Sequence, residues 1–582
     1  MRFKRIGLAT AALTLLAGCN LNEPLSLKIA HVNDTHSHFD EEFQKLGLPG
    51  ADGAPTLTYA QVGGFPRLKT KIDQLRLDAA GEDKDFLLLH AGDAFSGTLF
   101  FSLFKGQLNA DFMNLFEFDA MAIGNHEFDL GNEKLAEFAA SVEFPLISAN
   151  TKVKGDDALQ GAYLPLTIKM LKDQPIAIVG LTTEHTEIIS SPSDNTRFIK
   201  AKRAARKAVK ALRQYGVNKI VFLTHLGLEE DRLLAQSVPG IDVIIGGHSP
   251  ELLGDHSNIG LGNEFPSPIM ESGPKGDPVC IMHSGEYSRT IGVTDVEFSG
   301  DGKVESCNGQ NVFLVGEVFS QGTPPQPVDY DTQQIIAEYI SANANIEIVQ
   351  KDLTAQAMLD QAKLEVEAFA STVIGVTGEP LYHVRLPGDG HPDAGAIESG
   401  SMVAPHVAQS MANKMQQTSG QPYVSVMNAG GVRADLSGEI TVGSAYTVLP
   451  FSSTLVSMSV TGESLLNTLS TNVSNAYQIS GVAFPYVANI RYTINLSDPA
   501  TPRVQDVQIK GLDGIYQPLD LSSQYNLVTT SYLAGGGDLY QFEGAANVTD
   551  TGHIDADILV QYIENEPGGV LNRPNDWLSI IQ

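Results

Sequence analysis

The stretch DFLLLHAGDAFSG, residues 85–97, joins a short apolar run to a loop in which Asp93 stands between two glycines. An apolar run of this length that ends at glycine is typical of a buried β-strand. The same pattern occurs four more times in the first half of the chain. LKIAHV precedes NDTHSH (27–38), DAMAI precedes GNHEFDLG (119–131), KIVFLT precedes HLG (219–227), and IDVII precedes GGHSP (241–250). Each run ends at a glycine or at a side chain of a type that binds metals.

Stretches with a helical pattern, such as GFPRLKTKIDQLRLDAA (64–80), separate these apolar runs. Continuous apolar strands that alternate with helices predict a sheet covered on both faces. In such sheets ligands bind at the carboxyl ends of the strands, because the strand directions bring those loops together. We therefore expect the five loops to form one site.

The side chains in these loops are Asp, His and Asn without a thiolate, a donor set suited to zinc, manganese, iron or cobalt. Any one of them alone would more often be a turn residue or a surface histidine. About six donors exceed the needs of one catalytic ion, which favours two metals that share a carboxylate. We predict that Asp93 is this bridge and that the pair serves phosphoryl transfer.

In this order, NDTHSH, AGDAFSG, GNHEFDLG, THLG and GGHS resemble the metallophosphoesterase domain of the 5'-nucleotidase/UDP-sugar hydrolase family. NAGGVR (428–433), VLPFSST (448–454) and SYLAGGGDLY (531–540) extend the resemblance over nearly all of the mature chain. It implies an α/β protein in which a four-layer metallophosphoesterase sandwich is joined by a helix to a C-terminal α/β nucleotide-binding domain. It also implies two divalent metal ions, with Zn, Mn, Co or Mg as candidates.

The resemblance implies a role for each residue of the metal site. One metal would be bound by Asp34, His36 and Asp93, and the other by Asp93, Asn125, His225 and His248. His126 and Asp129 match the catalytic pair, in which the carboxylate orients an imidazole that stabilises charge on the transferring phosphoryl group. His38 is expected to support this shell and not to bind metal.

The stretch VIIGGHSP (243–250) departs from the family pattern at its last residue. Relatives place glutamine, asparagine or histidine where this chain has Pro250, which has no side-chain donor atom. The first metal would then take water, a backbone carbonyl or a displaced residue such as Glu251.

In the second half, the resemblance implies a substrate site. Two glycines before Arg433 let the backbone approach an anion that the guanidinium can bind in a bidentate manner. Phe451 and Tyr532 match an aromatic pair that sandwiches the nucleobase, and Asp538 matches a residue that contacts the sugar. Asn428, Gly431 and Arg385 complete the predicted set, although the segment around Arg385 aligns loosely. Ser453 stands where some relatives have a base-contacting asparagine, which leaves base preference open.

The N-terminus has three basic residues and an apolar run that suits an export signal but is too short to span a bilayer as a mature helix. LAGC (16–19) resembles the bacterial lipobox, which implies lipidation of Cys19; a plain secretory signal with an incidental cysteine is the alternative. Asn20 after this cysteine suggests the outer membrane, by resemblance to enteric lipoproteins. Cys280 and Cys307 could form a disulfide in that compartment or remain two free thiols.

A length of 582 residues predicts two domains. The predicted divisions are a signal peptide (1–18), a tether (19–26), a catalytic domain (27–315), a linker with a connecting helix (316–369) and a substrate-binding domain (370–582). Within the linker, the Pro- and Gly-rich residues 316–332 are expected to be loop, and helix formers follow from Asp352 to Phe369.

The formal net charge of −30 argues against a nucleic acid polymer as partner. One basic run, residues 197–216, is interpreted as a solvated amphipathic helix rather than a membrane-facing patch. The predicted function is metal-dependent removal of phosphate from extracellular 5'-nucleotides such as AMP. The alternatives are a UDP-sugar or NAD pyrophosphohydrolase on the same fold, and a nucleotide-binding lipoprotein with an impaired metal centre. A purely structural lipoprotein has no use for so many aligned polar strand ends.

Overall fold

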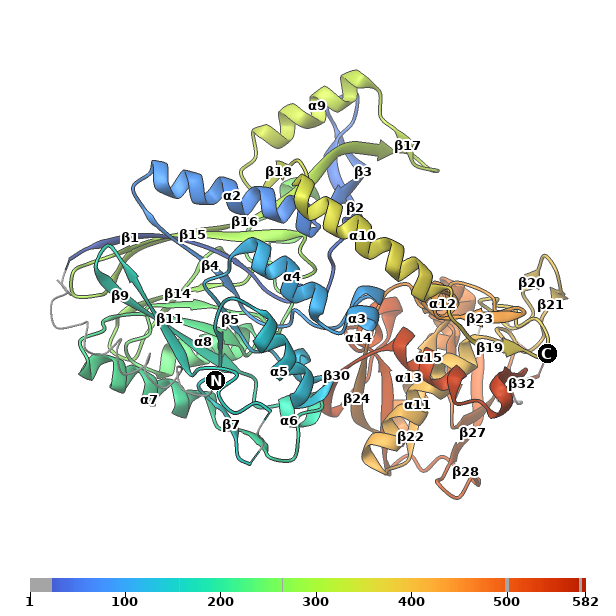
Figure 1. The fold of residues 1–582 in the computed structure, drawn as a ribbon. Coiled ribbons are helices and arrows are strands. Elements are labelled where there is room, and N and C mark those ends of the chain that lie inside the picture. Colours follow the sequence, from blue (N-terminus) through green and yellow to red (C-terminus); the bar gives the residue numbers. More distant parts are fainter. Residues whose placement is uncertain (1–22, 156–157, 264, 498–501, 575–577, 582) are drawn as a thin grey trace. The chain divides into compact units, whose positions relative to one another are not determined.

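The computed structural model describes residues 23–155, 158–263, 265–497, 502–574 and 578–581. The chain divides into two compact units at Lys363 and Leu364 (Figure 1). The predicted signal peptide, Cys19 and Asn20 lie outside the described residues. Among the helices that are described, none is long and apolar enough to cross a membrane.

The first unit contains two large sheets. In the first sheet the strand order is β2 (Glu42–Pro49), β3 (Pro55–Val62), β16 (Val304–Gln321), β15 (Thr290–Phe298), β1 (Leu25–Val32), β4 (Asp85–His90), β5 (Ala120–Ala122) and β6 (Leu146–Ile147). In the second sheet it is β13 (Ile269–Ser272), β14 (Pro278–Met282), β12 (Val243–Ile245), β11 (Lys219–His225), β9 (Gln174–Thr182) and β8 (Leu166–Leu171). The strands β1, β4, β5 and β6 are parallel, and so are β9, β11, β12 and β14.

The two sheets pack face to face around a shared apolar core. Ile29 and Leu87 of the first sheet belong to the same buried cluster as Val221 and Ile245 of the second. Helices α2 (Phe65–Gly81), α4 (Gln107–Phe116) and α5 (Gly131–Ser141) cover the other face of the first sheet, and α7 (Ala201–Gln214) and α8 (Leu228–Ser237) cover that of the second (Figure 1). Four layers result, as the family resemblance implies.

The expectation of one sheet with all five apolar runs was wrong. The runs before Asp34, Asp93 and Asn125 are β1, β4 and β5 of the first sheet, whereas those before His225 and His248 are β11 and β12 of the second. An apolar run indicates that both faces of a strand are buried, but it does not show whether a helix or a second sheet packs against each face. A disulfide between Cys280 of β14 and Cys307 of β16 joins the two sheets, which decides between the two alternatives for these cysteines.

The expected loop at residues 316–332 is largely regular structure. β16 continues to Gln321 and pairs with β3, and β17 (Gln326–Pro327) and α9 (Tyr330–Ser341) follow. The Pro- and Gly-rich residues 322–325 make only the turn between β16 and β17. The connecting helix is α10 (Leu353–Ala370), and the boundary between the two units lies inside it.

The second unit is built on a sheet with the strand order β25 (Pro485–Ala488), β22 (Tyr423–Asn428), β29 (Gln524–Thr530), β24 (Thr454–Thr461) and β30 (Ala546–Ile554). Helix α11 (Ala404–Ser419) packs on β22 and β25, and α13 (Gly462–Gln478) and α15 (Asp555–Glu564) contact β24 and β30 respectively. A smaller sheet runs in the order β28 (Tyr516–Pro518), β27 (Arg503–Lys510), β26 (Ile490–Asn495) and β32 (Leu578–Ile581).

Candidate metal centre and substrate-binding residues

The loops that follow β1, β4, β5, β11 and β12 meet at one place in the first unit. They bring together the predicted metal and catalytic residues Asp34, His36, Asp93, Asn125, His126, Asp129, His225 and His248. Ligand atoms of His36, Asp93 and His126 form one close group, and those of Asp93, His225 and His248 form another. The expectation that the five loops form one site is therefore confirmed.

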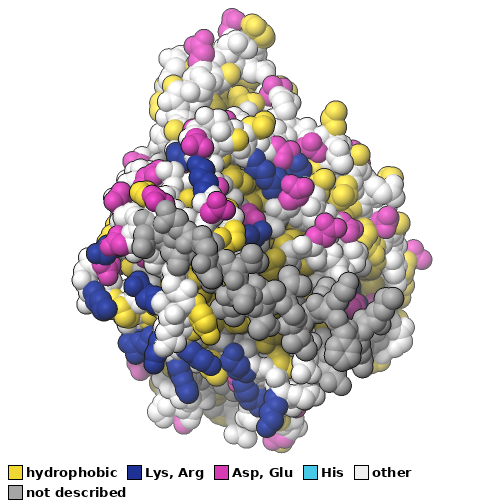
Figure 2. Space-filling view, turned by 60° about the vertical axis from the view of Figure 1, so that its left-hand side comes forward, with side chains coloured by type: hydrophobic (Ala, Val, Ile, Leu, Met, Phe, Trp, Pro, Cys, Tyr) yellow, Lys and Arg dark blue, Asp and Glu magenta, His cyan; other side chains and the backbone are white. Residues whose placement is uncertain are grey.

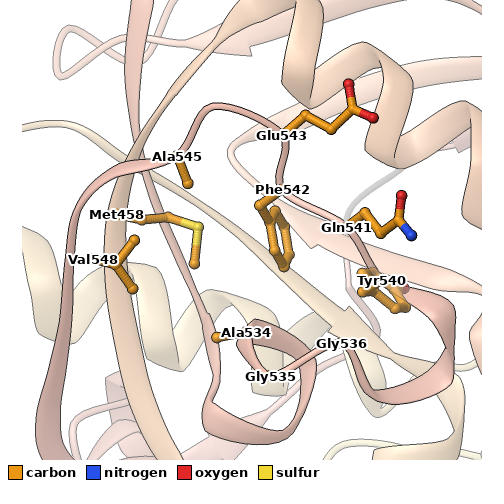
Figure 3. Close-up of a pocket in the computed structure, with 10 residues that line it drawn as sticks. All are labelled: Met458, Ala534, Gly535, Gly536, Tyr540, Gln541, Phe542, Glu543, Ala545 and Val548. Carbon is orange, nitrogen blue, oxygen red and sulfur yellow. The ribbon is translucent and has the colours of Figure 1, made fainter. Parts of the chain in front are cut away.

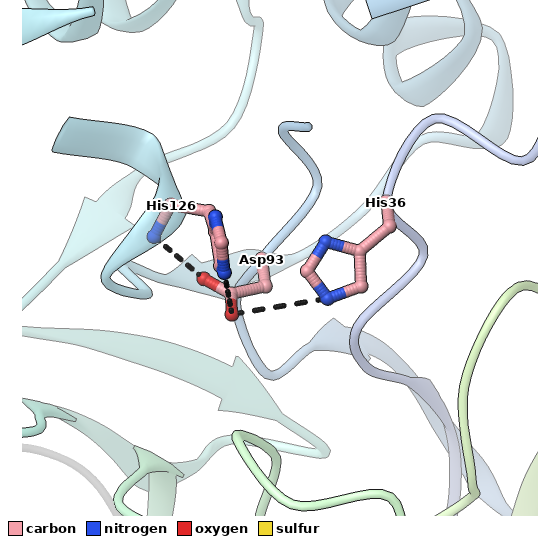
Figure 4. A group of neighbouring side chains, drawn as sticks. All are labelled: His36, Asp93 and His126. Atoms are coloured by element: carbon pink, nitrogen blue, oxygen red, sulfur yellow. Dashed lines mark hydrogen bonds and ion pairs between the residues drawn. The ribbon is translucent and has the colours of Figure 1, made fainter. Parts of the chain in front are cut away.

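Asp93 lies at the centre of both groups. Its Oδ2 is 2.9 Å from Nε2 of His225 and 4.0 Å from Nε2 of His36. Nε2 of His126 is 3.9 Å from the same oxygen, while the backbone N–H of His126 donates to Oδ1 (Figure 4). A single carboxylate oxygen thus faces imidazoles from both predicted metal sites, which is the placement expected of a bridging ligand.

The hydrogen bonds of His225 show that these donors fit a cation. Nδ1 of His225 is 2.9 Å from the carbonyl oxygen of Ala91, so this nitrogen carries a proton. In the neutral ring Nε2 then has a lone pair, which points at Asp93 Oδ2 and at Asn125 Oδ1 3.1 Å away. Three electron pairs that converge in a buried site need a proton or a metal ion between them, and a ring N–H donated to a backbone carbonyl is usual for a metal-binding histidine.

His36 is held in the same manner. Its Nδ1 is 2.9 Å from the carbonyl oxygen of Phe95, which turns Nε2 toward Asp34 Oδ1 at 3.9 Å and toward Asp93. The carboxylate of Asp34 accepts hydrogen bonds from Asn33 Nδ2 at 2.7 Å and from the backbone N–H of His248. The oxygen and imidazole donors of both groups match a dinuclear site for borderline divalent metals.

The titratable groups of the cluster are buried together and shift one another's pKa values. Burial raises the pKa of Asp34 to about 6 and lowers the pKa values of His36 and His248 to about 4 and 3. Burial would also lower the pKa of His225, but attraction to Asp93 outweighs it and raises that pKa to about 9. The carboxylate of Asp93 thus favours a positive charge beside His225, which a bound divalent cation would supply.

Four of the ligand residues have a left-handed backbone. The φ angles of Asp34, His36, Asp93 and His248 are 48°, 46°, 57° and 80°. Residues other than glycine adopt this conformation at a cost, and such strain is concentrated at functional sites. The surrounding fold thus stabilises the ligand geometry against the local preference of the chain.

His126 and Asp129 form the predicted pair. Nδ1 of His126 is 2.7 Å from Asp129 Oδ2, and the carboxylate also accepts hydrogen bonds from the hydroxyl groups of Ser96 and Ser190. The pair lies on one turn, where His126–Phe128 is a 3-10 helix. Since Asp129 fixes the ring through Nδ1, Nε2 points toward Asp93 and is available to a substrate oxygen.

Sequence reasoning missed Glu127, which organises this turn. Its buried carboxylate accepts hydrogen bonds from the backbone N–H groups of Asp93, Ala94, Phe95 and Gly124, at 2.7–3.2 Å. It thereby ties the loop after β4 to the loop after β5. The signal was present in GNHEFDLG, where a carboxylate stands between two predicted site residues.

The structure leaves His38 and Glu251 outside both ligand groups. His38 bonds to Glu42 and stacks on Tyr287 with 4.2 Å between ring centroids, in agreement with a supporting role. The backbone carbonyl of Glu251 accepts a hydrogen bond from the N–H of Gly285, and none of the described ligand groups includes its side chain. Glu251 is therefore not seen to replace the donor that Pro250 lacks.

In the second unit, the predicted base-stacking residues are exposed. The side chains of Phe451 and Tyr532 are 60% and 53% exposed, which is unusual for large aromatic groups. The guanidinium of Arg433 lies 5.9 Å from the ring centroid of Phe451. Asp538 accepts hydrogen bonds from the Tyr532 hydroxyl at 2.9 Å and from Asn428 Nδ2 at 2.6 Å. These residues therefore form one cluster on the second unit.

Gly431 and Arg385 belong to the same region. A Cβ atom on Gly431 would lie 2.3 Å from Met427 Cε and 2.7 Å from Asn428 Oδ1, so a larger residue in the turn after β22 would displace these two side chains. Arg385 and Arg433 line a cavity of about 480 Å³ together with His383 and His391. Asp389 also lines it, and burial lowers the pKa of His383 to about 4, so the two guanidinium groups are the part of the lining that suits an anionic group.

A second cavity, of about 500 Å³, lies behind the glycine-rich loop that carries Asp538 (Figure 3). Met458, Phe542 and Val548 contribute apolar side chains to it, and Glu543 contributes a carboxylate. No Lys or Arg is among the described residues that line it, so it does not suit a phosphate group.

Comparisons with known proteins agree with this geometry. Residues 27–252 match the family model of the calcineurin-like phosphoesterases, and residues 394–544 match that of the 5'-nucleotidase C-terminal domain. The chain is 34% identical over 559 residues to a probable 5'-nucleotidase from Treponema pallidum, over 92% of this chain and 91% of that protein.

Two solved structures extend the similarity to the fold. NAD nucleotidase from Haemophilus influenzae matches with a TM-score of 0.84 at 29% identity, over 96% of this chain and 100% of that one. The 5'-nucleotidase precursor from Thermus thermophilus matches with a TM-score of 0.57 at 30% identity, over the same shares of the two chains.

Proposed function

Since the chain belongs to the 5'-nucleotidase family of metallophosphoesterases, we propose that it hydrolyses extracellular 5'-nucleotides such as AMP to nucleoside and phosphate. The observation that carries this proposal is the position of Asp93 Oδ2, which faces His36, His126 and His225 at 2.9–4.0 Å. Two divalent ions bound there would polarise the phosphoryl oxygens and supply a nucleophilic hydroxide near neutral pH.

The residues of the chain have separate tasks in this reaction. Asp34, His36 and Asp93 would hold one ion, and Asp93, Asn125, His225 and His248 the other. His126, fixed by Asp129, would place a charged or proton-donating Nε2 at the transferring phosphoryl group. The exposed pair Phe451 and Tyr532 would stack on the base, with Asp538 at the sugar and Arg433 at a phosphate oxygen.

A substrate panel with metal analysis tests the proposal. Purified protein should release phosphate from AMP, lose this activity on chelation and regain it with Mn²⁺ or Zn²⁺. Adenosine binding without metal-restored hydrolysis would instead support a nucleotide-binding protein with an impaired metal centre.

The second candidate is hydrolysis of a pyrophosphate bond, in NAD or a UDP-sugar. Two observations favour it: the similarity to an NAD nucleotidase, and the cavity lined by His383, Arg385, His391 and Arg433, which could receive a second phosphate. Release of UMP from UDP-glucose, or of mononucleotides from NAD, at a higher kcat/KM than phosphate from AMP would reverse the order of the two candidates.

We also propose that the mature chain is held at the bacterial outer membrane by a lipid on Cys19. The sequence LAGC after an apolar run supports this. Labelling with a radioactive fatty acid should mark the wild-type protein and not a Cys19→Ser variant.

A further inference from the structure

Helix α7 (Ala201–Gln214) has a surface that the proposed reaction does not use. Its apolar side is buried against the second sheet through residues such as Ala204, Val209 and Leu212. Its other side is basic and exposed, and consists of Lys202, Arg203, Arg206, Lys207, Lys210 and Arg213. We call these six residues the basic face. The helix has no acidic residue, although the whole chain has a net charge of −30.

The basic face has few partners among the described residues: Arg206 donates to the backbone carbonyl of Ser237, and Arg213 lies near Asp242, where burial raises the pKa of the carboxyl group and the guanidinium lowers it. None of its six residues takes part in an ion pair there, whereas the neighbouring Lys200 bonds to Glu184 at 2.6 Å. Arg203 and Lys207, like Arg206 and Lys210, are four residues apart, and like charges at that spacing destabilise a helix. The chain has 68 acidic residues, yet none of those described forms an ion pair with the basic face. This charge pattern is typical of a surface that binds an external anion.

Further basic residues lie beside the basic face, outside the helix. Lys152, Lys154 and Arg197 lie on or beside the pair of strands β7 (Thr151–Val153) and β10 (Thr196–Phe198). Burial lowers the pKa of Lys152, and the nearby charge of Lys207 lowers it further. Figure 2, which turns the left-hand side of Figure 1 forward, shows Lys and Arg side chains gathered along the lower part of this side of the molecule. Tyr215, directly after the helix, is 59% exposed, and tyrosine is common at membrane interfaces.

The start of the described chain lies near the end of this helix. Gln174 donates a hydrogen bond to the backbone carbonyl of Pro24 and accepts one from Lys219, which follows α7 by five residues. Pro24 is five positions after Cys19, a reach of at most about 17 Å for an extended chain. A lipid on Cys19, as proposed above, would therefore keep a membrane close to the basic face.

In place of the merely solvated helix that the sequence of residues 197–216 indicates, we propose that the basic face docks on the phosphate headgroups of an anionic lipid bilayer and sets the orientation of the first unit on the membrane. The face is one side of a single helix with no groove and no row of aromatic side chains for bases, so a lipid surface fits it better than a nucleic acid. The net negative charge elsewhere on the chain repels the same bilayer, which favours this one orientation.

The test uses residues 20–582, which contain every described residue and lack the proposed lipid. Sedimentation with vesicles of phosphatidylcholine alone, or mixed with phosphatidylglycerol, is measured at low and at high salt. The protein should sediment with the anionic vesicles at low salt and remain in solution with the neutral ones.

Two matched triple variants isolate the face. Arg203→Gln, Lys207→Gln and Lys210→Gln together should weaken binding to anionic vesicles by on the order of a hundredfold, since each basic residue contributes roughly fivefold. Lys45→Gln, Lys275→Gln and Lys303→Gln change the net charge equally at exposed positions elsewhere in the first unit and should bind like the wild type. AMP hydrolysis in solution should be unchanged in both, which shows that the fold is intact.

Three results would overturn the proposal. They are an equal effect of the two triple variants, equal binding to neutral and anionic vesicles, and binding to a DNA duplex without binding to vesicles. None of them bears on hydrolysis of AMP, so failure of this proposal and failure of the proposed function are distinguishable.

Discussion

The two units present their candidate functional groups in opposite ways. Asp93, Asn125 and His225 in the first unit are at most 2% exposed and are fixed by buried hydrogen bonds. Phe451 and Tyr532 in the second unit are more than half exposed. The groups assigned to bond cleavage are thus held rigidly before any substrate arrives, whereas the groups assigned to base recognition have few contacts to constrain them.

This difference follows from what each task needs. Converging charges must be buried to act strongly, and the fold must then offset both their desolvation and their backbone strain. A stacking surface needs only an open aromatic face, because every base has a π face. Changes in the first unit should therefore lower kcat and metal content, and changes in the second should raise KM.

The largest effect is expected at the shared carboxylate. Asp93→Asn removes the negative charge that faces both ligand groups, so both metals should be lost and kcat should fall by on the order of ten-thousandfold or more. Metal content per chain and phosphate release from AMP measure this. Asp111→Asn, at an exposed carboxylate of α4, should leave both unchanged. Loss of one ion with retention of the other would reject the bridge.

A smaller effect is expected at the imidazole. His126→Ala should keep the metals and lower kcat by roughly a hundredfold or more, because a positioned acid–base group contributes on this scale. Metal analysis separates this outcome from collapse of the site. If turnover were unchanged, His126 would have no part in the reaction.

Glu127 tests whether rigidity itself matters. In Glu127→Gln one of the two accepting oxygens is replaced by an NH₂ group, which faces two backbone N–H groups that it cannot accept from. The loop after β4 should therefore become more mobile. Metal affinity should fall about 10–100-fold, the usual cost of losing a group that orients ligands. Excess Mn²⁺ should restore most of kcat. Glu133→Gln, at an exposed position of α5, is the control, and an effect as large there would remove the special role of Glu127.

The second unit should respond in KM. Phe451→Ala removes one stacking face, which is worth about 1–3 kcal/mol per base, so KM for AMP should rise roughly tenfold with metal content unchanged. Tyr330→Ala changes an aromatic side chain of α9 that is 73% exposed and predicted to have no such role. A fall in kcat at constant KM for Phe451→Ala would contradict the division of tasks between the units.

The sequence predicts the metal site far better than it predicts the sheets. Asp34, Asp93 and His248 are recognisable because each follows an apolar run, and the runs are indeed strands. The division of these strands between two sheets is not encoded locally, since Ile29 and Ala30 are equally apolar although one faces the other sheet and the other faces helices.

Other features depend on contacts between distant residues. The position of Glu127 in GNHEFDLG marks it as a candidate, but its partners, the N–H groups of residues 93–95, are about 30 residues earlier and cannot be read from that stretch. The continuation of β16 past residue 315 follows from its pairing with β3, which is about 260 residues earlier in the chain. The roles of Phe451 and Tyr532 are predicted from the family resemblance alone, because the residue type does not distinguish an exposed aromatic side chain from a buried one.

Burial of a carboxyl group should also affect stability in the second unit, where Asp555 Oδ1 accepts a hydrogen bond from the backbone N–H of Ala556 at 2.8 Å. Burial raises the pKa of Asp555, at the start of α15, from 3.8 to about 8. Between these values the folded unit holds a proton that the unfolded chain releases, so the stability contributed at low pH is lost as pH rises toward 8.

The Asp555→Asn variant cannot titrate and should lose this part of the pH dependence. Between pH 5.5 and pH 7.5 the free energy of unfolding should therefore fall by up to about 1.4 kcal/mol per pH unit in the wild type, and by less in Asp555→Asn. Melting temperatures of the second unit at the two pH values measure this difference. Glu564→Gln, at an exposed carboxylate of the same helix, should keep the wild-type dependence. Parallel curves for all three proteins would mean that Asp555 keeps its charge in the fold, and that burial in this unit is less complete than in the metal centre.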